Sequence, residues 1–395
     1  LGRGEKLTGV ALDDSEIRTI LETLGFTLTG KGKTLSVAVP SWRPDVHGAA
    51  DIVEEVIRIA GLDRVKAVPL PRLHGITQPV LTERQKRSRR TRRVLAARGM
   101  VEAVTWSFLP RHVAAAFGGG SDALELANPI STDLSSMRPS LLPGLLTAVE
   151  RNRNRGTPDV ALFELGQAYR GDAEGDQFIS AAGVRAGTAR LSGGGRHWDG
   201  KAETVTEFDA KADVTAAIAA LGLDPAKAQI TRDAPGWFHP GRSATLRLGP
   251  KSILAHFGEL HPDTLKSLDV AGPVVGFEIF LDALPPEKRK SRARPALVAA
   301  DLLPVRRDFA FVLDRLVAAS DVVKAAASAD KSLIQSVTVF DVFEGGALAA
   351  DGKKSLAIEV TIQPTTATLT DKDIEALSQK IVADVKKATG GEIRG

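Results

Sequence analysis

The last part of the chain, about residues 302 to 395, carries the pattern that most restricts the fold. Short apolar or alternating runs predict strands, and apolar side chains that repeat every three or four residues predict helices. These patterns predict strands at 309–313, 337–343, 355–363 and near 393, and helices at 320–328 and 371–387. The resulting order, βαββαβ, is that of the ferredoxin-like split motif. Thr370 and Asp373 predict a capped start for the final helix.

The chain is long enough for more than one such domain. A length of 395 residues predicts two or three domains, and 43% hydrophobic with 25% charged residues excludes a disordered or collagen-like chain. With 0 Cys, the sequence has no disulfide framework, thiolate metal site or cysteine nucleophile. It shows no signal peptide and no apolar run long enough to span a bilayer. We therefore expect a cytoplasmic protein with no membrane partner, and the start at Leu1 indicates the downstream part of a longer one.

Residues 1–73 form the first predicted domain. Apolar side chains between Ile17 and Leu24 repeat at helical spacing. Two β-rich runs, 26–29 and 34–39, predict a hairpin, and a second helix is predicted at 49–60. Helix, hairpin and helix in so small a unit predict a winged-helix-like domain.

Residues 80–290 form the second predicted domain. Helices are predicted at 82–98 and after Ser140, and strands are predicted at 160–165, 243–248, 253–260 and 274–281. Helices first and many strands later predict an antiparallel sheet with helices packed on it. With the last domain at 302–395, the whole chain is predicted to be an α+β multidomain protein.

Basic residues gather at the start of this second region. Eight Lys or Arg and a single acid lie between Leu81 and Met100, although the whole chain has 52 basic and 48 acidic residues. Further clusters lie at 151–155 and 288–294. Such clusters attract phosphate, so nucleic acid is a predicted partner. A solvated helix face or a basic linker explains the same clusters equally well.

Acidic residues gather before and within the helix at 49–60. Asp51 stands three and four residues before Glu54 and Glu55, so these three can share one helical face, and Asp45 can fold back toward the helix start. A cluster of oxygen ligands suits Mg²⁺ or Ca²⁺ better than zinc. The alternative is an ordinary acidic first turn with an ion pair from Glu54 to Arg58. Spacing alone favours this alternative.

Short motifs of specific content follow one another along the chain. They are Pro40-Ser41-Trp42-Arg43-Pro44-Asp45 with Asp51-Ile52-Val53-Glu54-Glu55, Asn128-Pro129-Ile130-Ser131, Met137-Arg138-Pro139-Ser140-Leu141-Leu142-Pro143-Gly144-Leu145, Phe163-Glu164-Leu165-Gly166, Gly258-Glu259-Leu260-His261-Pro262, Pro304-Val305-Arg306-Arg307-Asp308, Phe340-Asp341-Val342-Phe343 and Gly352-Lys353-Lys354-Ser355-Leu356. In content and order these motifs resemble the bacterial phenylalanyl-tRNA synthetase β subunit family. The resemblance covers essentially the whole chain.

The resemblance implies the C-terminal part of a β subunit that works in an (αβ)₂ heterotetramer with a catalytic α subunit. ATP, phenylalanine and the tRNA end would bind to the α subunit, and the editing domain would lie upstream of Leu1. The acidic signature of the family is a Mg²⁺ site near the α subunit, and its positions fall on Asp45, Asp51, Glu54 and Glu55. Spacing alone favours an ordinary acidic first turn, whereas the resemblance implies a magnesium site.

The resemblance also implies that residues 80–290 are a catalytic-like module of class II synthetases. In that class, two arginines stabilise the ATP phosphates, one in a Phe-Arg-x-Glu strand and one that closes a Gly-x-Gly-hydrophobic-Glu-Arg strand. The corresponding positions are interpreted here as Leu162 and Ile279. Because aliphatic side chains cannot bind phosphate, the sequence predicts a catalytically inactive module with a structural and interface role.

Residues 302–395 would be the ferredoxin-fold anticodon-binding domain, with phenylalanine tRNA as partner. We predict Arg307 and Lys354 as phosphate contacts and Phe343 as a base-stacking contact. Phe343 stands where Tyr is common in the family. The alternative pairs Arg307 with Asp308 or Asp341 and places Phe343 in the core. Net charge gives no support, because this region has 12 basic and 13 acidic residues.

Two other functions stay open at this point. One is a free-standing nucleic-acid-binding protein that uses the first and last domains. The other is an active class II ligase, which the two aliphatic positions disfavour. A large exposed apolar surface on the second domain would indicate a subunit partner and would disfavour a free-standing protein.

Overall fold

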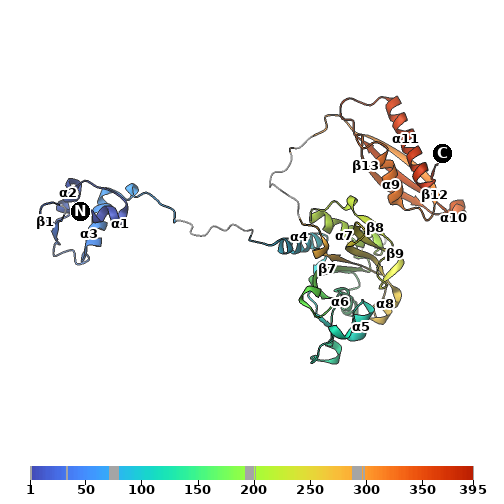
Figure 1. The fold of residues 1–395 in the computed structure, drawn as a ribbon, viewed down its shortest axis with the longest axis horizontal. Helices are drawn as coiled ribbons and strands as arrows, with labels where there is room; N and C mark the ends of the chain where they lie inside the picture. The colour runs from blue at the N-terminus through green and yellow to red at the C-terminus, as the bar shows by residue number, and fades with distance from the viewer. Residues whose placement is uncertain are drawn as a thin grey trace. The chain divides into compact units, whose positions relative to one another are not determined.

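The computed structural model describes residues 2–32, 34–70, 80–191, 200, 202–286, 296 and 299–394. Contacts divide the chain into two units, Leu1–Glu287 and Lys288–Gly395 (Figure 1). None of the helices in the described residues is long and apolar enough to cross a membrane.

Residues 2–64 contain helices around a small hairpin. The elements are α1 (Arg3–Thr8), α2 (Asp14–Thr23), β1 (Thr27–Thr29), β2 (Ser36–Ala38), α3 (Ala49–Ala60) and a 3₁₀ turn at Leu62–Arg64. β1 and β2 pair antiparallel. Their small core comes from α2, α3 and the turns between elements: Ile20, Leu21, Phe26, Val46 and Val56. The predicted α2, hairpin and α3 are confirmed, whereas α1 was not predicted.

Residues 80–286 are built around a seven-stranded sheet. Its strands are β3 (Val101–Glu102), β6 (Val160–Tyr169), β7 (Gln177–Ala186), β8 (Gln229–Thr231), β9 (Phe238–Leu248), β10 (Ser252–Leu260) and β11 (Val274–Phe280). Their order across the sheet is β3-β6-β7-β11-β10-β9-β8. β3 and β6 are parallel, and the other neighbours are antiparallel. The predicted antiparallel sheet is therefore confirmed, with one parallel edge pair.

Helices cover both faces of this sheet. They are α4 (Glu83–Ala97), α5 (Arg111–Ala116), α6 (Leu142–Asn154), α7 (Glu207–Ala220) and α8 (Pro262–Ser267), and a separate pair of short strands is formed by β4 (Phe108–Leu109) and β5 (Ser136–Met137). One core packs α4 and α7 against side chains such as Phe163, Phe257 and Phe277. The other packs α6 against Val184 and Val274. In Figure 1, α7 and α6 accordingly lie on either side of β7.

Residues 302–394 have the predicted βαββαβ order. The elements are β12 (Val305–Asp314), α9 (Ala319–Ser328), β13 (Ile334–Phe343), α10 (Gly346–Ala350), β14 (Lys353–Ile362), α11 (Asp371–Thr389) and β15 (Glu392–Ile393). The sheet order is β13-β14-β12-β15, and α9 and α11 pack on one face through a shared core. Thr370 Oγ1 accepts from the backbone N–H of Asp373, whose carboxylate accepts from the backbone N–H of Thr370, so the predicted cap is confirmed. The short helix α10 was not predicted.

Candidate functional sites

The turn before α3 is centred on Arg43. Its Nε donates to Asp45 Oδ1 at 2.9 Å, and its Nη2 donates to Asp45 Oδ2 at 2.6 Å. Its Nη1 donates to Glu55 Oε2 at 2.9 Å, and Arg58 Nη2 donates to the same oxygen at 2.6 Å. These guanidinium hydrogen bonds, chiefly those of Arg43, lower the pKa of both Asp45 and Glu55 to about 2. Both carboxylates are therefore ionised and already paired.

The other two predicted ligands have different surroundings. Asp51 Oδ2 accepts the backbone N–H groups of His47 at 2.9 Å and Gly48 at 2.8 Å, which lowers the pKa of Asp51. Asp51 therefore caps the start of α3. Glu54 is exposed and has no hydrogen bond or ion pair with any described residue. The ion pair that the sequence alternative gave to Glu54 is made by Glu55 with Arg58 instead.

The magnesium site predicted on these four carboxylates stays a prediction. Among the described residues, no group of three or more His, Asp or Glu side chains is arranged to hold a metal ion. Cations of the chain bond both oxygens of Asp45 and of Glu55, and backbone N–H groups bond Oδ2 of Asp51. Within the chain, Arg43 neutralises Asp45 and Glu55, and Asp51 caps α3.

The three predicted tRNA contacts are not brought together. Arg307 pairs with Val360 near one end of β12, whereas Lys354 pairs with Leu313 near the other end. Lys354 is buried, and its Nζ donates to the Val317 carbonyl at 2.7 Å. This burial and the internal hydrogen bond speak against a phosphate contact at Lys354, which stays a prediction.

Phe343 and Arg307 are accessible. Phe343 has 47% of its surface exposed, so the alternative that places it in the core is wrong. Arg307 is exposed and makes no ion pair with Asp308, Asp341 or any other described residue. Both side chains stay available for the predicted contacts.

The open face of the C-terminal sheet is acidic. Phe309, Phe311 and Leu313 lie in the core with α9 and α11, so alternate residues of β12 and their partners point to the opposite face. Phe343 lies on that face, because its partner Ser355 is also the partner of Val312. The face carries five acids and two bases, Asp308, Asp314, Asp341, Glu359, Glu392, Arg306 and Lys353. Such a face does not attract phosphate, so any RNA contact here depends on stacking.

The two aliphatic positions of the second domain lie on opposite faces of its sheet. Leu162 pairs with Val184, which packs with α6, whereas Ile279 pairs with Ala181, which packs with α7. They therefore cannot be the two phosphate-binding positions of one site, and that part of the sequence argument is wrong. Arg170 follows Tyr169 at the end of β6, and its Cζ lies 4.3 Å from the ring centre of Phe178. Tyr169-Arg170-Gly171-Asp172 has the order aromatic-arginine-x-acid, further along the same strand than Glu164.

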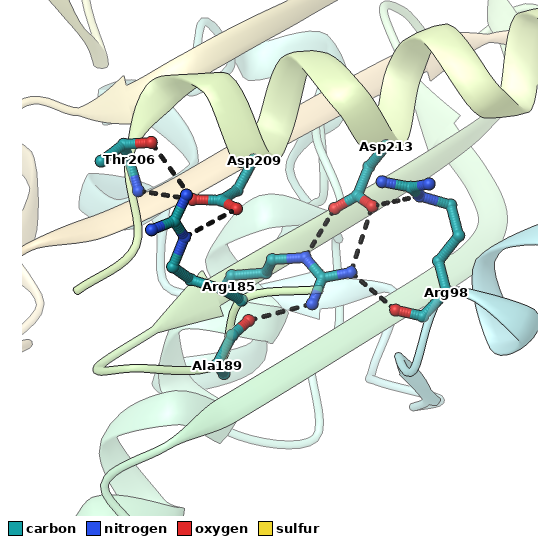
Figure 2. A network of polar contacts seen from close by, with 7 residues as sticks. Arg98, Arg185, Ala189, Thr206, Asp209 and Asp213 are labelled. Atoms are coloured by element: carbon teal, nitrogen blue, oxygen red, sulfur yellow. Dashed lines mark hydrogen bonds and ion pairs between the residues drawn. The ribbon is translucent and has the colours of Figure 1, made fainter. Parts of the chain in front are cut away.

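Buried polar networks join the elements of the second domain. Figure 2 shows Asp213 of α7 between Arg185 of β7 and Arg98, which follows α4. Asp213 is fully buried, and it accepts from Arg185 Nε at 2.7 Å and from Arg98 Nε at 2.6 Å. Arg185 also donates to the carbonyls of Ala189 and Arg98, both at 2.9 Å. The network ties two helices to the sheet, and no local pattern in the sequence indicated it.

A second network holds the loop before α6. Arg138 Nη1 donates to Glu164 Oε1 at 2.8 Å, and Ser140 Oγ donates to Glu278 Oε1 at 2.6 Å. Burial raises the pKa of Glu278 to about 7, against the opposing effect of the Ser140 hydrogen bond. The Met137–Leu145 motif is therefore fixed to two different strands, β6 and β11.

Comparison with known proteins identifies the class of this chain. Residues 1–62 match the family model described as tRNA synthetase B5 domain. Residues 69–281 match phenylalanyl tRNA synthetase beta chain CLM domain, and residues 302–394 match ferredoxin-fold anticodon binding domain. These matches place the chain among the aminoacyl-tRNA synthetases. More narrowly, the chain belongs to the phenylalanyl-tRNA synthetase β chain family.

Curated relatives agree with this assignment. A protein of Rhodopseudomonas palustris named phenylalanine–tRNA ligase beta subunit is 53% identical over 397 residues, which cover 100% of this chain and 49% of that protein. Relatives of the same name from Mesorhizobium japonicum (52% identical) and Brucella abortus (53% identical) each cover 99% of this chain and 49% of their own length. The chain thus spans about half the length of these relatives. A solved pyrrolysyl-tRNA synthetase of Desulfitobacterium hafniense aligns with 50% of this chain and 67% of its own length, at 17% identity and a TM-score of 0.38. We base no conclusion on this alignment.

Proposed function

We propose that this chain acts within the β subunit of a phenylalanine–tRNA ligase and supports the ATP-dependent attachment of phenylalanine to its tRNA. The observation that carries the proposal is the 52–53% identity to proteins named as that subunit across 99–100% of the chain. Because the chain spans about half of those relatives, activity belongs to the assembled enzyme. The free-standing nucleic-acid-binding alternative has no support among these relatives.

The partners follow from the same proposal. A β subunit implies an α subunit, which we propose to hold ATP and phenylalanine in an (αβ)₂ heterotetramer in the cytoplasm. The order of elements in residues 2–64 supports a winged-helix-like domain, and the seven-stranded sheet supports a class II-like module. We still predict that this module alone is catalytically inactive. Leu162 and Ile279 no longer support that prediction, because they lie on opposite faces of the sheet. A Mg²⁺ site on Asp45, Asp51, Glu54 and Glu55, which the family resemblance implies, is part of the proposal.

Residues 302–394 are proposed to bind the anticodon region of phenylalanine tRNA. The family-model match supports this role. Phe343 is exposed on the open face, where an unpaired base can stack, and Arg307 is an exposed cation without an acidic partner in the described residues. Lys354 is not part of the proposal.

Co-purification and charging test this function directly. The β subunit that contains this chain is expressed with an α subunit, either intact or without residues 302–394. The intact complex should copurify and charge tRNA with phenylalanine. The shortened complex should keep phenylalanine-dependent ATP–pyrophosphate exchange and show a strongly raised KM for tRNA.

Two results would overturn the proposal. One is an intact complex that charges no phenylalanine. The other is a shortened complex with an unchanged KM for tRNA, which would remove the anticodon role from residues 302–394. As a further control, the 395-residue chain alone should show no ATP–pyrophosphate exchange above a blank preparation.

A further inference from the structure

We infer that a groove beside α4 is a docking site for an acidic, partly apolar segment of the α subunit. The groove is lined by α4 and by the strands β6 and β7, and it encloses about 570 Å³. Three arginines, Arg84, Arg89 and Arg92, contribute to its lining, and we call it the α4 groove. The inference rests on the proposed function, because that proposal supplies the α subunit.

Two other contacts hold α4 against the domain and give the groove a fixed shape. Arg87 Nη1 donates to the Leu284 carbonyl at 2.9 Å. Arg92 Nε donates to Glu102 Oε1 of β3 at 2.7 Å. The positive charges of Arg87 and Arg92 are thus already used inside the domain.

Arg89 has no such partner. Its side chain is exposed and makes no hydrogen bond or ion pair with the residues that the structure describes. Arg84 pairs with Asp282 at 3.5 Å, and 51% of its side chain is exposed. Arg90 and Arg93 of the same helix are exposed and have no partner in the described part of the chain either. The α4 groove and its surroundings therefore carry positive charge that the described residues do not neutralise.

This charge disfavours the helix on which it lies. Seven of the fifteen residues of α4 are basic and one, Glu83, is acidic. Arg89 and Arg93 stand four residues apart, and like charges at this spacing destabilise a helix. Cations near the first turn also oppose the helix dipole. Carboxylates of a bound partner would relieve both effects.

The α4 groove also has an apolar lining. Leu81, Leu165 of β6 and Ile179 of β7 contribute to it, and all three side chains are half-buried. A phosphate backbone has no apolar group to place there. A polypeptide can place an apolar side chain between these residues and carboxylates beside the arginines, where charge-assisted hydrogen bonds form. This combination favours an acidic protein segment over RNA.

The source of that segment follows from charge and from the proposed function. A second copy of α4 does not fit, because it would bring two sets of arginines together, and like charges exclude such a pairing. The relatives that match this chain are named as beta subunits. We therefore commit to the α subunit as the partner that supplies the acidic segment.

The rate at which the α subunit leaves the assembled complex tests the inference. The β subunit that contains this chain is expressed with the α subunit and immobilised, and release of α is followed in low and high salt. In about 50 mM NaCl, Arg89→Glu should raise the dissociation rate about tenfold, because it places like charges against each other. In about 500 mM NaCl, the increase should fall to about twofold, since salt screens the repulsion. The neutral Arg89→Gln should lie between the two.

Arg232→Glu is the matched control. Arg232 is exposed, follows β8 at the opposite edge of the same sheet, and pairs with no residue that the structure describes. The same reversal of charge there should leave the dissociation rate unaltered. Leu81→Ala tests the apolar lining, and it should raise the rate about threefold at both salt concentrations, because apolar contacts are not screened. Circular dichroism of each variant checks that the fold is kept.

The outcomes separate this inference from the proposed function. If the unsubstituted complex charges phenylalanine while Arg89→Glu releases α no faster than Arg232→Glu, the inference alone is overturned. If the unsubstituted subunits do not copurify, the proposed function fails and the inference fails with it. If Arg89→Glu retains α but binds phenylalanine tRNA about tenfold more weakly, the α4 groove is an RNA site and the inference is wrong.

Discussion

At the scale of single residues, burial decides which charges matter for stability. Asp213 lies between two guanidinium groups in a fully buried position, whereas Asp122 is 92% exposed in its pair with Arg111. A charge that loses its partner in the interior cannot be solvated, so removal of the partner is costly there and nearly neutral at the surface.

Asp213→Asn should therefore destabilise the second domain strongly. We expect a loss of about 3 to 5 kcal/mol in the free energy of unfolding, because the buried Arg185 and the partly buried Arg98 would lose their anionic partner. Urea unfolding monitored by circular dichroism gives the measurement. Asp122→Asn is the surface control and should behave like the unsubstituted chain; equal losses in both variants would contradict the argument.

Glu278 should make stability depend on pH. Its pKa in the folded chain is raised to about 7 from the ordinary 4.5, so the folded state holds a proton that the unfolded state loses. Its stabilising contribution is complete below pH 4.5 and declines as the pH rises to 7, by about 1.4 kcal/mol for each unit of the shift.

Glu278→Gln carries the uncharged form at every pH. Relative to the unsubstituted chain, it should gain stability between pH 4.5 and 7 and keep a constant difference above pH 7. Urea unfolding at a series of pH values would show this. A difference that is independent of pH across that window would mean that Glu278 titrates normally.

At the scale of elements, local sequence explains some boundaries fully. α11 begins at Asp371 because Thr370 and Asp373 satisfy each other's backbone N–H groups, and both residues are visible in the sequence. α7 and β7 were not predicted, because Ala-rich segments such as Glu207–Ala220 offer little contrast between a buried and an exposed face. These elements form through packing against the rest of the sheet.

Thr370→Ala should shorten or weaken the start of α11. The expected loss is about 1 kcal/mol in the free energy of unfolding, since the first turn loses its side-chain acceptor. Thermal or urea unfolding measures it, and Thr366→Ala in the preceding loop is the control. No difference between the two variants would show that solvent replaces the cap at no cost.

At the scale of the whole molecule, the surface of the C-terminal unit limits how it can bind RNA. Its open face carries more acids than bases, so long-range attraction of phosphate is weak there. Phe343 is an exposed aromatic side chain on that face. Binding through this face would therefore depend on base stacking more than on charge.

Phe343→Ala should weaken tRNA binding in the assembled ligase. We expect the KM for tRNA to rise about tenfold, in line with the roughly 1–3 kcal/mol of one base–aromatic stack. Adenylate formation and the melting temperature should stay unchanged. Phe340→Ala removes a neighbouring ring that is 58% exposed and serves as the control. A lower melting temperature with an unaltered KM would place the tRNA contact elsewhere.

The sequence by itself determined the order of elements in the last domain, the cap of α11, and the motifs that revealed the family. These features depend on neighbouring residues or on repeats of two to four positions, which one strand or helix expresses locally. It could also list the acidic residues before α3, but it could not tell which of them were already paired.

Only the tertiary structure decided which partners the predicted site residues have. Arg43 reaches across twelve residues to Glu55, Lys354 finds a carbonyl thirty-seven residues away, and Asp213 joins Arg98 across 115 residues. Leu162 and Ile279 were separated by the faces of a sheet whose strand order the sequence did not show. The role of a charged side chain or a sheet face depends on the residues that folding brings into contact with it. Because those residues lie far apart along the chain, the local sequence does not indicate the contact.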